Sequence, residues 1–337
     1  MLRHFAALLF LALPWSLPLA AAEQVNLYSA RQEALIKPLL ERFTEQTGIR
    51  VNMVSAKDDA LIKRLESEGR NSPADLLLTA DAGRLHRARE LGLLAPLRSE
   101  TLEGRIPASY RDPEGHWFGL SLRARPILYV RGKVDPAELS SYDALADPRW
   151  KGRICIRSSD NIYNQSLVAS MIATRGEVAT EAWVRGLVAN FARPPQGGDR
   201  DQIKAAAAGQ CDIAIANTYY LAAMLADTGA ERDSAAKLAV FWPNQDGRGV
   251  HVNVSGIGLT TAARNGEQAR RLIEFLVSDE AQRWYAESNH EYPVVEGVEP
   301  SEILKAWGPF KADDLNLSAL GRYNADAVRL MDRAGWK

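Results

Sequence analysis

Cysteine is scarce in this chain and charge of one sign is not in excess. Two cysteines occur among 337 residues, which excludes a disulfide-rich scaffold and a zinc site built from thiolates. Lys and Arg total 41 against 42 Asp and Glu, so the formal net charge is -1. A nucleic-acid partner is not expected, because the basic surface of a nucleic-acid-binding protein is missing.

Long hydrophobic runs are absent beyond the N-terminus. Arg3 and His4 precede the apolar stretch 5–14, and small residues follow at 20–22. A positive start, a short apolar segment and a small-residue site are typical of a signal peptide. Pro14 and Pro18 interrupt the run, which is shorter than the roughly 20 residues that a membrane span needs. We therefore predict a signal peptide over 1–22, cleaved near Ala22, and an exported protein, periplasmic in a Gram-negative host.

Strands and helices alternate along the first part of the mature chain. With 46% hydrophobic and 25% charged residues the composition is that of a globular protein, and the length predicts two domains or lobes. Predicted strands cover 25–29, 49–54 and 74–79, and apolar residues recur at helical spacing between them and on to about Leu91. This order is typical of an α/β lobe with a doubly wound sheet.

The same pattern starts again after the stretch 107–119, which is rich in proline and glycine. Strands are predicted at 126–130, 153–157, 211–216 and 250–259, the first of them crossing between lobes, and one helix is predicted over 269–285. We expect two doubly wound lobes joined by crossing hinge strands. The first comprises 23–122 and 250–300, and the second comprises 123–249 and 301–337. A cleft between such lobes suits a protein that closes around a small ligand.

Two strand-to-helix connections share one spacing. Tyr163 follows Cys155 by eight positions, and Tyr219 follows Cys211 by eight. If the two strands are parallel neighbours in register, the cysteines lie at one level of the sheet, within the distance of a disulfide. The tyrosines then emerge together at the carboxyl ends of the strands, where open α/β sheets bind ligands.

Tyr163, Tyr219 and Tyr220 are expected in the first turns of their helices, because residues that favour N-caps precede them at 158–161 and 217–218. A helix N-terminus favours negative charge, so we expect these phenols to ionise more easily than an ordinary tyrosine. Clustered phenolates suit a hard cation such as Fe(III), whose binding displaces the protons. The alternative is a tyrosine pair that serves packing and makes one hydrogen bond.

Arg123 and Arg125 flank one alanine on a predicted strand, so both point to the same face. Two guanidinium groups at a cleft suit a bidentate anion such as carbonate or phosphate. The alternative is that one of them pairs with an acidic neighbour at the hinge. His86, His116, His251 and His290 are scattered without ligand spacing, and surface or capping roles are expected for them.

Several segments together resemble one known family. They are VNLYSAR (25–31), TGIRV (47–51), PAD (73–75), GLLAP (92–96), WFGLSLRAR (117–125), RSSDNIYNQ (157–165), NTYY (217–220), VNVSG (252–256) and EYPV (291–294). In this order they resemble the ferric-ion-binding periplasmic proteins of bacterial ABC iron uptake. Those proteins have the type II periplasmic binding-protein fold, and the resemblance covers nearly the whole mature chain.

The resemblance implies that Tyr219 and Tyr220 are Fe(III) ligands, that Tyr163 is a third, and that Arg123 holds a synergistic anion such as carbonate. It also implies that a monomer delivers iron to an inner-membrane ABC permease and its ATPase.

The first lobe departs from the family pattern. Gln32 stands where some members have a histidine ligand, Glu33 where one branch has a tyrosine, and Ala80 where another branch has a glutamate. Glu33 is either a substitute carboxylate ligand or an exposed charge on a helix, and Arg31 either contacts an anion or lies on the surface. We therefore expect three phenolates completed by an anion or water.

Two other functions remain open. The first is a receptor of the same fold for an organic or inorganic anion, such as a phosphonate or carboxylate, bound by Arg123, Arg31 and the helix N-termini. The second is an exported enzyme such as a hydrolase, which no nucleophile–base spacing supports.

Overall fold

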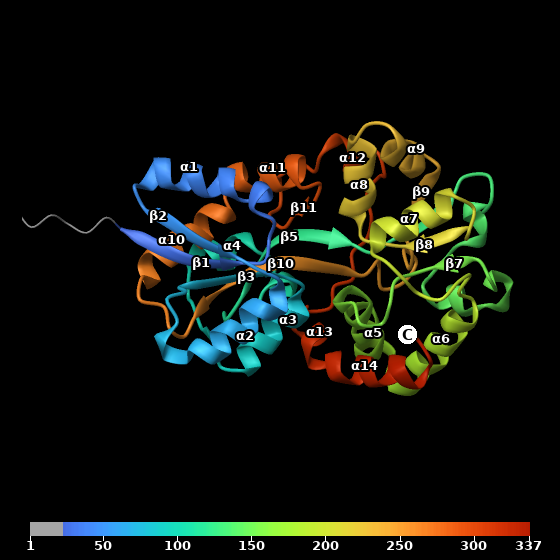
Figure 1. The fold of residues 1–337 in the computed structure, drawn as a ribbon, viewed down its shortest axis with the longest axis horizontal. Coiled ribbons are helices and arrows are strands. Elements are labelled where there is room, and N and C mark those ends of the chain that lie inside the picture. The colour runs from blue at the N-terminus through green and yellow to red at the C-terminus, as the bar shows by residue number, and fades with distance from the viewer. Residues whose placement is uncertain (1–22) are drawn as a thin grey trace, which may run out of the picture.

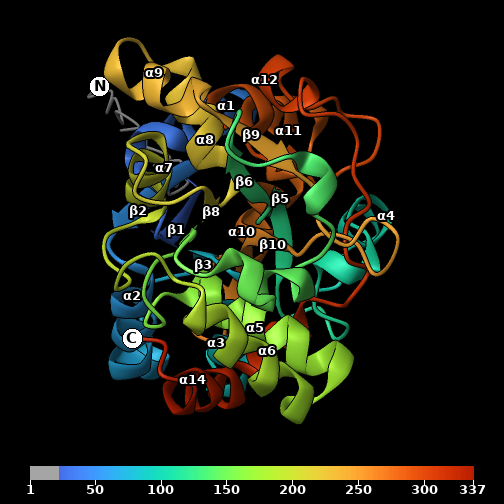
Figure 2. The same ribbon diagram turned by 90° about the vertical axis from the view of Figure 1, so that its right-hand side faces the viewer.

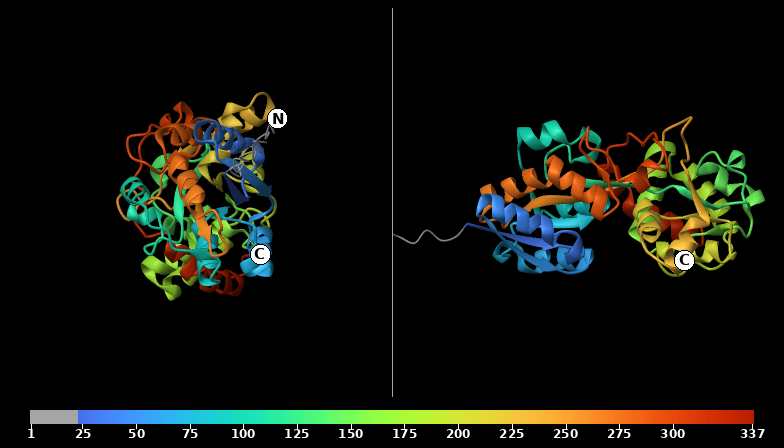
Figure 3. Two further views of the ribbon diagram at one scale, coloured as in Figure 1. Left: turned by 90° about the vertical axis from the view of Figure 1, so that its left-hand side faces the viewer. Right: turned by 90° about the horizontal axis from the view of Figure 1, so that it is seen from above.

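The computed structural model describes residues 23–337, so the predicted signal peptide lies outside the described residues. Two lobes lie end to end along the long axis of the molecule (Figures 1 and 3). Each lobe has its own β-sheet with helices packed on it. From residue 23 onward, no helix combines the length and the apolar character that crossing a membrane requires.

The first lobe is built on a sheet with the strand order β11-β5-β10-β3-β1-β2, and β4 also pairs with β10. β1 is parallel to β2 and β3, whereas β10 is antiparallel to β3 and β5. The strands are β1 (Gln24–Ser29), β2 (Arg50–Ser55), β3 (Leu76–Ala80), β4 (Leu94–Ala95), β5 (Phe118–Ala124), β10 (Val252–Thr260) and β11 (Tyr292–Pro293).

The helices of the first lobe bury apolar stripes against this sheet. In α1 the stripe is Leu39, Leu40 and Phe43, and the helix ends at Gly48, whose φ of 75° is the left-handed conformation common at helix C-termini. The α-helices are α1 (Lys37–Thr47), α2 (Asp58–Glu68), α3 (Ala82–Glu90), α4 (Glu100–Arg105), α10 (Gly266–Leu276) and α11 (Asp279–Ser288). Short 3-10 turns are η1 (Glu33–Leu35), η2 (Gly69–Asn71) and η3 (Ala108–Tyr110).

The prediction of a single helix over 269–285 is wrong. The chain forms α10 and α11, separated at Val277 and Ser278. The Ser278 side chain accepts a hydrogen bond from the backbone N–H of Ala281 and so caps the second helix. A serine at this position starts a new helix, although the apolar spacing continues through the break.

The second lobe has a four-stranded sheet in the order β7-β8-β6-β9. Helices α5, α6 and α14 lie on one side of this sheet and α7, α8 and α9 on the other (Figure 2). The strands are β6 (Ile127–Val130), β7 (Ile154–Cys155), β8 (Ile213–Ile215) and β9 (Leu238–Phe241). The helices are α5 (Ile162–Arg175), α6 (Glu177–Ala189), α7 (Asp199–Ala207), α8 (Thr218–Ala226), α9 (Ala230–Ala236), α12 (Glu302–Lys305), α13 (Ser318–Arg322) and α14 (Asn324–Arg333), with 3-10 turns η4 (Pro136–Glu138), η5 (Asp143–Ala146) and η6 (Pro148–Trp150).

The crossing between lobes differs from the prediction. β6 pairs with β8 and β9 inside the second sheet, so it does not cross. β5 ends in the first sheet at Ala124, which pairs with Val252 of β10, and the chain passes between lobes directly after it. The hydroxyl of Tyr142 donates to the carbonyl of Arg125 at 2.8 Å and accepts from the N–H of His251 at 3.1 Å. One buried phenol therefore links both passages of the hinge.

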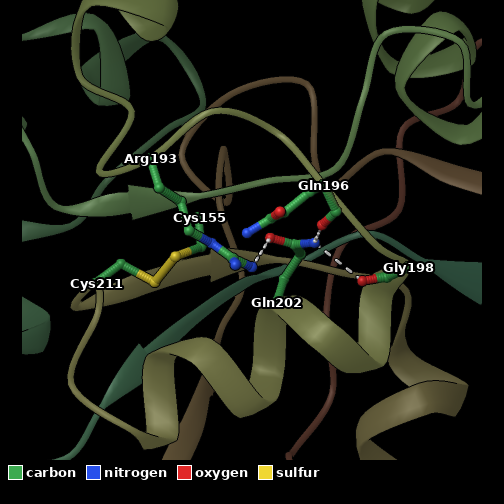
Figure 4. Close-up of a disulfide and its surroundings, with 6 residues drawn as sticks. All are labelled: Cys155, Arg193, Gln196, Gly198, Gln202 and Cys211. Carbon is green, nitrogen blue, oxygen red and sulfur yellow. Dashed lines mark hydrogen bonds between the residues drawn. A yellow bond between two sulfur atoms is a disulfide. The ribbon is translucent and has the colours of Figure 1, made fainter. Parts of the chain in front are cut away.

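The disulfide prediction is confirmed, but the register assumed for it is wrong. Cys155 and Cys211 are bonded, with their Cα atoms 5.9 Å apart (Figure 4). β7 and β8 are parallel, yet Cys155 lies opposite Ala214. Cys211 lies in the loop between α7 and β8. It is close enough to Cys155 to form the disulfide, although the two residues are not paired in the sheet. The disulfide therefore ties the strand that leads to α5 to the segment that leads to α8.

Candidate metal centre

Three tyrosines enter the cleft from the first turns of two helices. Tyr163 is the second residue of α5, where the side chain of Asn161 accepts a hydrogen bond from its N–H at 3.1 Å. Tyr219 and Tyr220 are the second and third residues of α8, which begins at Thr218. Because β7 and β8 are parallel neighbours, their carboxyl ends bring these two helix starts together.

The phenols are in mutual contact. The hydroxyl of Tyr219 donates to the hydroxyl of Tyr163 at 3.2 Å. The rings of Tyr219 and Tyr220 lie with their centroids 4.3 Å apart. All three line a cavity of about 390 Å³ between the lobes, together with Ala30, Arg31, Gln32, Leu35, Leu78, Ala80, Arg123, Arg200, Ala223, Ser255, Ser288, Asn289, His290 and Glu291.

The expectation of easy ionisation is wrong for Tyr163 and Tyr219 in the metal-free protein. Burial raises the pKa of Tyr163 and of Tyr219 above the ordinary tyrosine value, and the nearby phenol of Tyr220 adds to the effect on both. Arg123 acts in the opposite direction on both, but burial outweighs it. Burial therefore opposes ionisation of these two phenols, and a cation bound in the cavity would favour it.

Positive charge is nevertheless concentrated around Tyr163. The guanidinium carbons of Arg123, Arg125 and Arg157 lie 5.7, 6.0 and 5.7 Å from the centroid of its ring. Arg125 and Arg157 both pair with the buried carboxylate of Asp199, so Arg123 is the one of the three that lowers the pKa of Tyr163, while Asp199 raises it.

Arg123 and Arg125 differ in what their guanidinium groups bind. Arg123 is 2% exposed and makes one long bond, from Nη1 to the hydroxyl of Ser255 at 3.4 Å. Its Nε and Nη2 have no hydrogen-bond partner among the described residues, and Nη2 is 4.0 Å from a carboxylate oxygen of Asp81. That carboxylate also accepts from Ser166 and Asn253 at 2.8 Å each, and Arg123 itself lines the cavity.

Arg125 is bound within the second lobe. It donates to Asp199 at 2.8 Å, Asn217 at 2.9 Å and Asn164 at 2.8 Å. It is absent from the residues that line the cavity. This guanidinium fixes the starts of α5, α7 and α8 relative to one another, which is the hinge pairing considered as the alternative for one of the two arginines.

The first lobe supplies Arg31 and Gln32 to the cavity but not Glu33. Arg31 donates to Glu291 at 2.8 Å and to Ser121 at 3.1 Å. Both acceptors belong to the first lobe, so the guanidinium of Arg31 is bound within that lobe. The side chain of Glu33 is 60% exposed and pairs with Lys37 at 3.3 Å. Glu33 lines a separate surface groove along α1 and β2, so the structure does not bring it together with the tyrosines.

Sequence reasoning missed several cavity residues, of which His290 is the most consequential. A surface or capping role was expected for it, yet it lines the same cavity as the three tyrosines. Burial lowers its pKa below the ordinary histidine value. No group of three or more His, Cys, Asp or Glu able to hold a metal occurs within 23–337.

Two α/β lobes, a hinge and a polar cavity between them define a solute-binding protein that closes around its ligand. The chain matches the profile of the bacterial extracellular solute-binding protein family over residues 71–312 and belongs to that family. This is a family of binding proteins and not of enzymes.

Comparison with individual proteins is more specific than the match to the family profile. The chain is 50% identical over 316 residues to iron uptake protein A1 of Synechocystis sp., covering 94% of this chain and 88% of that protein. It is 31% identical over 319 residues to the Fe(3+)-binding periplasmic protein of Serratia marcescens, covering 94% and 92%. A solved structure of Trichodesmium FutA in complex with iron and citrate superposes with a TM-score of 0.91 at 52% identity, covering 93% of this chain and 100% of that one. The resemblance to ferric-binding proteins of the type II fold is thereby confirmed.

Proposed function

We propose that this protein binds Fe(III) in the periplasm and delivers it, as a monomer, to an inner-membrane ABC permease and its ATPase. Tyr163, Tyr219 and Tyr220 are the metal ligands, and Arg123 holds the anion that completes the coordination. The signal peptide over 1–22 accounts for export. The observation that carries this proposal is the convergence of three phenols on one cavity between the lobes.

The chemistry of the cavity suits a trivalent cation. Three phenolates neutralise the charge of Fe(III), and the ion displaces protons that burial otherwise holds on Tyr163 and Tyr219. The guanidinium group of Arg123 then stabilises the phenolate of Tyr163 further. The site should therefore prefer Fe(III) to cations that are weaker Lewis acids. A weaker Lewis acid offsets less of the free-energy cost of ionising a buried phenol.

The anion is carbonate or a small carboxylate. The unpartnered Nε and Nη2 of Arg123 form the planar pair of donors that matches two oxygens of such an anion. Citrate accompanies iron in the Trichodesmium relative, which makes citrate the natural competitor of carbonate in a binding test.

A metal titration tests the proposal directly. Purified mature protein is titrated with Fe(III) in bicarbonate, and binding is followed by calorimetry and by visible absorption. We expect one iron per chain and a phenolate-to-iron charge-transfer band. A solution that stays colourless and releases no heat contradicts the proposal.

A receptor for an anion without iron is the second candidate. The free guanidinium donors of Arg123 support it, because they would bind a phosphonate or carboxylate without any metal. A thermal-shift screen of such anions in chelator-treated buffer separates the two functions. Stabilisation by an anion alone, with no response to Fe(III), favours the second candidate.

A further inference from the structure

The segment 288–291 of the first lobe contributes several polar side chains to the cavity wall. Glu291 is occupied, since its carboxylate accepts from Arg31 and from Ser121, both at 2.8 Å. Asn289 directs its amide N–H toward the carbonyl of Leu35 at 3.4 Å. Two buried polar atoms on this wall have no hydrogen-bond partner among the described residues, Oδ1 of Asn289 and the imidazole Nδ1 of His290. A buried polar nitrogen without a partner is rare in native proteins and calls for an explanation.

The backbone conformation of His290 is a second unusual feature of this residue. Its φ is 53°, and the other non-glycine residues with positive φ in the described chain are Asp81 and Asn244. The N–H groups of Asn289 and Glu291 both bond to the carbonyl of Tyr285 at 3.2 Å, so His290 stands in the left-handed turn that ends α11. Glycine or asparagine would make this turn with less strain. The turn does not use the imidazole, yet the turn places it on the cavity wall.

We propose that His290 is the first-lobe ligand of the bound iron. Imidazole nitrogen is a suitable donor for iron, and this side chain lies across the cleft from the phenols of α5 and α8. Iron held by ligands from both lobes binds the closed state better than the open one, so the ion itself drives closure. The inference rests on the proposed function and adds the residue that couples metal binding to the hinge.

Electron spin echo envelope modulation of the iron-loaded protein tests the assignment, because it detects imidazole nitrogen bound to the metal. The wild type is compared with His290→Asn and His290→Gly, both of which tolerate positive φ. The matched control is His116→Asn. His116 lies outside the cavity, with its Nδ1 2.9 Å from Asp112. Iron affinity is measured in parallel by competition with a chelator.

We expect nitrogen modulation in the wild type and in His116→Asn, and its loss in both His290 variants. Iron affinity should fall at least about tenfold in the His290 variants, while the charge-transfer band persists because the phenols remain. Iron binding without nitrogen modulation, or modulation that survives in His290→Asn, overturns the assignment and leaves the proposed function standing. Protein that takes up no iron overturns both.

Discussion

The phenol oxygens of Tyr163 and Tyr219 lie 3.2 Å apart, although the residues are separated by 56 positions in the chain. The contact exists because the parallel strands β7 and β8 each lead into a helix whose first turn carries the tyrosine. Two oxygens at this separation can occupy neighbouring positions around one metal ion. In the structure the same pair shares a hydrogen bond, which the proposed iron ligation would replace.

Removing one of these hydroxyls should therefore remove a ligand without disturbing the fold. For Tyr163→Phe or Tyr219→Phe we expect the charge-transfer band to weaken or shift, and iron affinity to fall by more than about 100-fold, since even changes behind the ligands cost roughly 10–100-fold. Tyr129→Phe is the matched control, because Tyr129 lies on β6 and does not line the cavity. Unchanged absorption and affinity in both cleft variants would contradict the ligand assignment.

Iron binding should release protons from the phenols. The pKa values of Tyr163 and Tyr219 lie above the ordinary tyrosine value because of burial, so both groups hold their protons near neutral pH. Ligation displaces them, which makes affinity increase with pH. In weakly buffered solution, each of Tyr163→Phe and Tyr219→Phe should release about one proton fewer per iron than the wild type. Equal proton release in variant and wild type would mean that the phenols bind unionised or not at all.

The elements predicted correctly from the sequence are those whose structure is determined by residues close to them in the chain. β3 is a continuous apolar run, as a buried strand requires, α1 ends at Gly48, and Asn161 caps α5 as its residue type predicts. The order of these elements was enough to indicate the fold class and a cleft between two lobes, whereas the ligand assignment of the three tyrosines came from the family resemblance and stays a prediction.

The elements that sequence could not predict depend on tertiary contacts. β7 is only two residues long, so its register with β8 is set by surrounding packing and not by its own pattern. The pKa of a phenol depends on burial, which spacing does not reveal. His290 reaches the cavity through the turn after α11, and its one local indication was a histidine preceding the EYPV segment. Neither the turn nor its left-handed backbone was evident beforehand.

Arg123 and Arg125 should separate binding from stability. Arg123→Gln removes a guanidinium with free donors, so we expect iron affinity to fall and to lose its dependence on bicarbonate. The loss of stability should be smaller than for Arg125→Gln, because Arg123 is 4.0 Å from Asp81 and that carboxylate keeps Ser166 and Asn253 as donors. Arg125→Gln removes the nearer of the two arginine partners of buried Asp199 and leaves Arg157 at 3.4 Å. It should destabilise the fold by about 3 kcal/mol, the lower end of the cost of breaking a buried ion pair. Urea unfolding and bicarbonate-dependent iron titration of both variants check this. The reverse outcome would assign the anion to Arg125.

The disulfide should contribute mainly to stability. Bonding residues 56 positions apart restricts the unfolded chain and stabilises the fold by about 4 kcal/mol in the chain-entropy description. We expect Cys155→Ala/Cys211→Ala to unfold at lower urea concentration and still bind iron. Thiol titration of the denatured, unreduced wild type should find no free cysteine. Two reactive thiols there, or equal stability of the variant, would contradict the expectation.

Stability should decrease in mild acid because of His251 at the hinge. This side chain is 3% exposed, and burial lowers its pKa well below the ordinary histidine value, with Arg248, Arg125 and Arg123 acting in the same direction. The unfolded chain takes up this proton below pH about 6.5 while the folded chain resists it. The unfolded state then binds more protons, so the free energy of unfolding falls as pH falls, by about 1.4 kcal/mol per pH unit for this one group.

Urea unfolding of the metal-free protein at pH 7.5, 6.0 and 5.0 measures this dependence. Burial lowers the pKa of His86 and His290 as well, so the wild-type slope contains contributions in the same direction from all three. His251→Gln isolates the contribution of His251, because it removes one titrating group from the difference in bound protons between the unfolded and folded states. Its stability should therefore decline less steeply below pH 6.5 than that of the wild type. Parallel profiles for the two proteins would show that the hinge accepts a charged imidazole, despite the three arginines that face it.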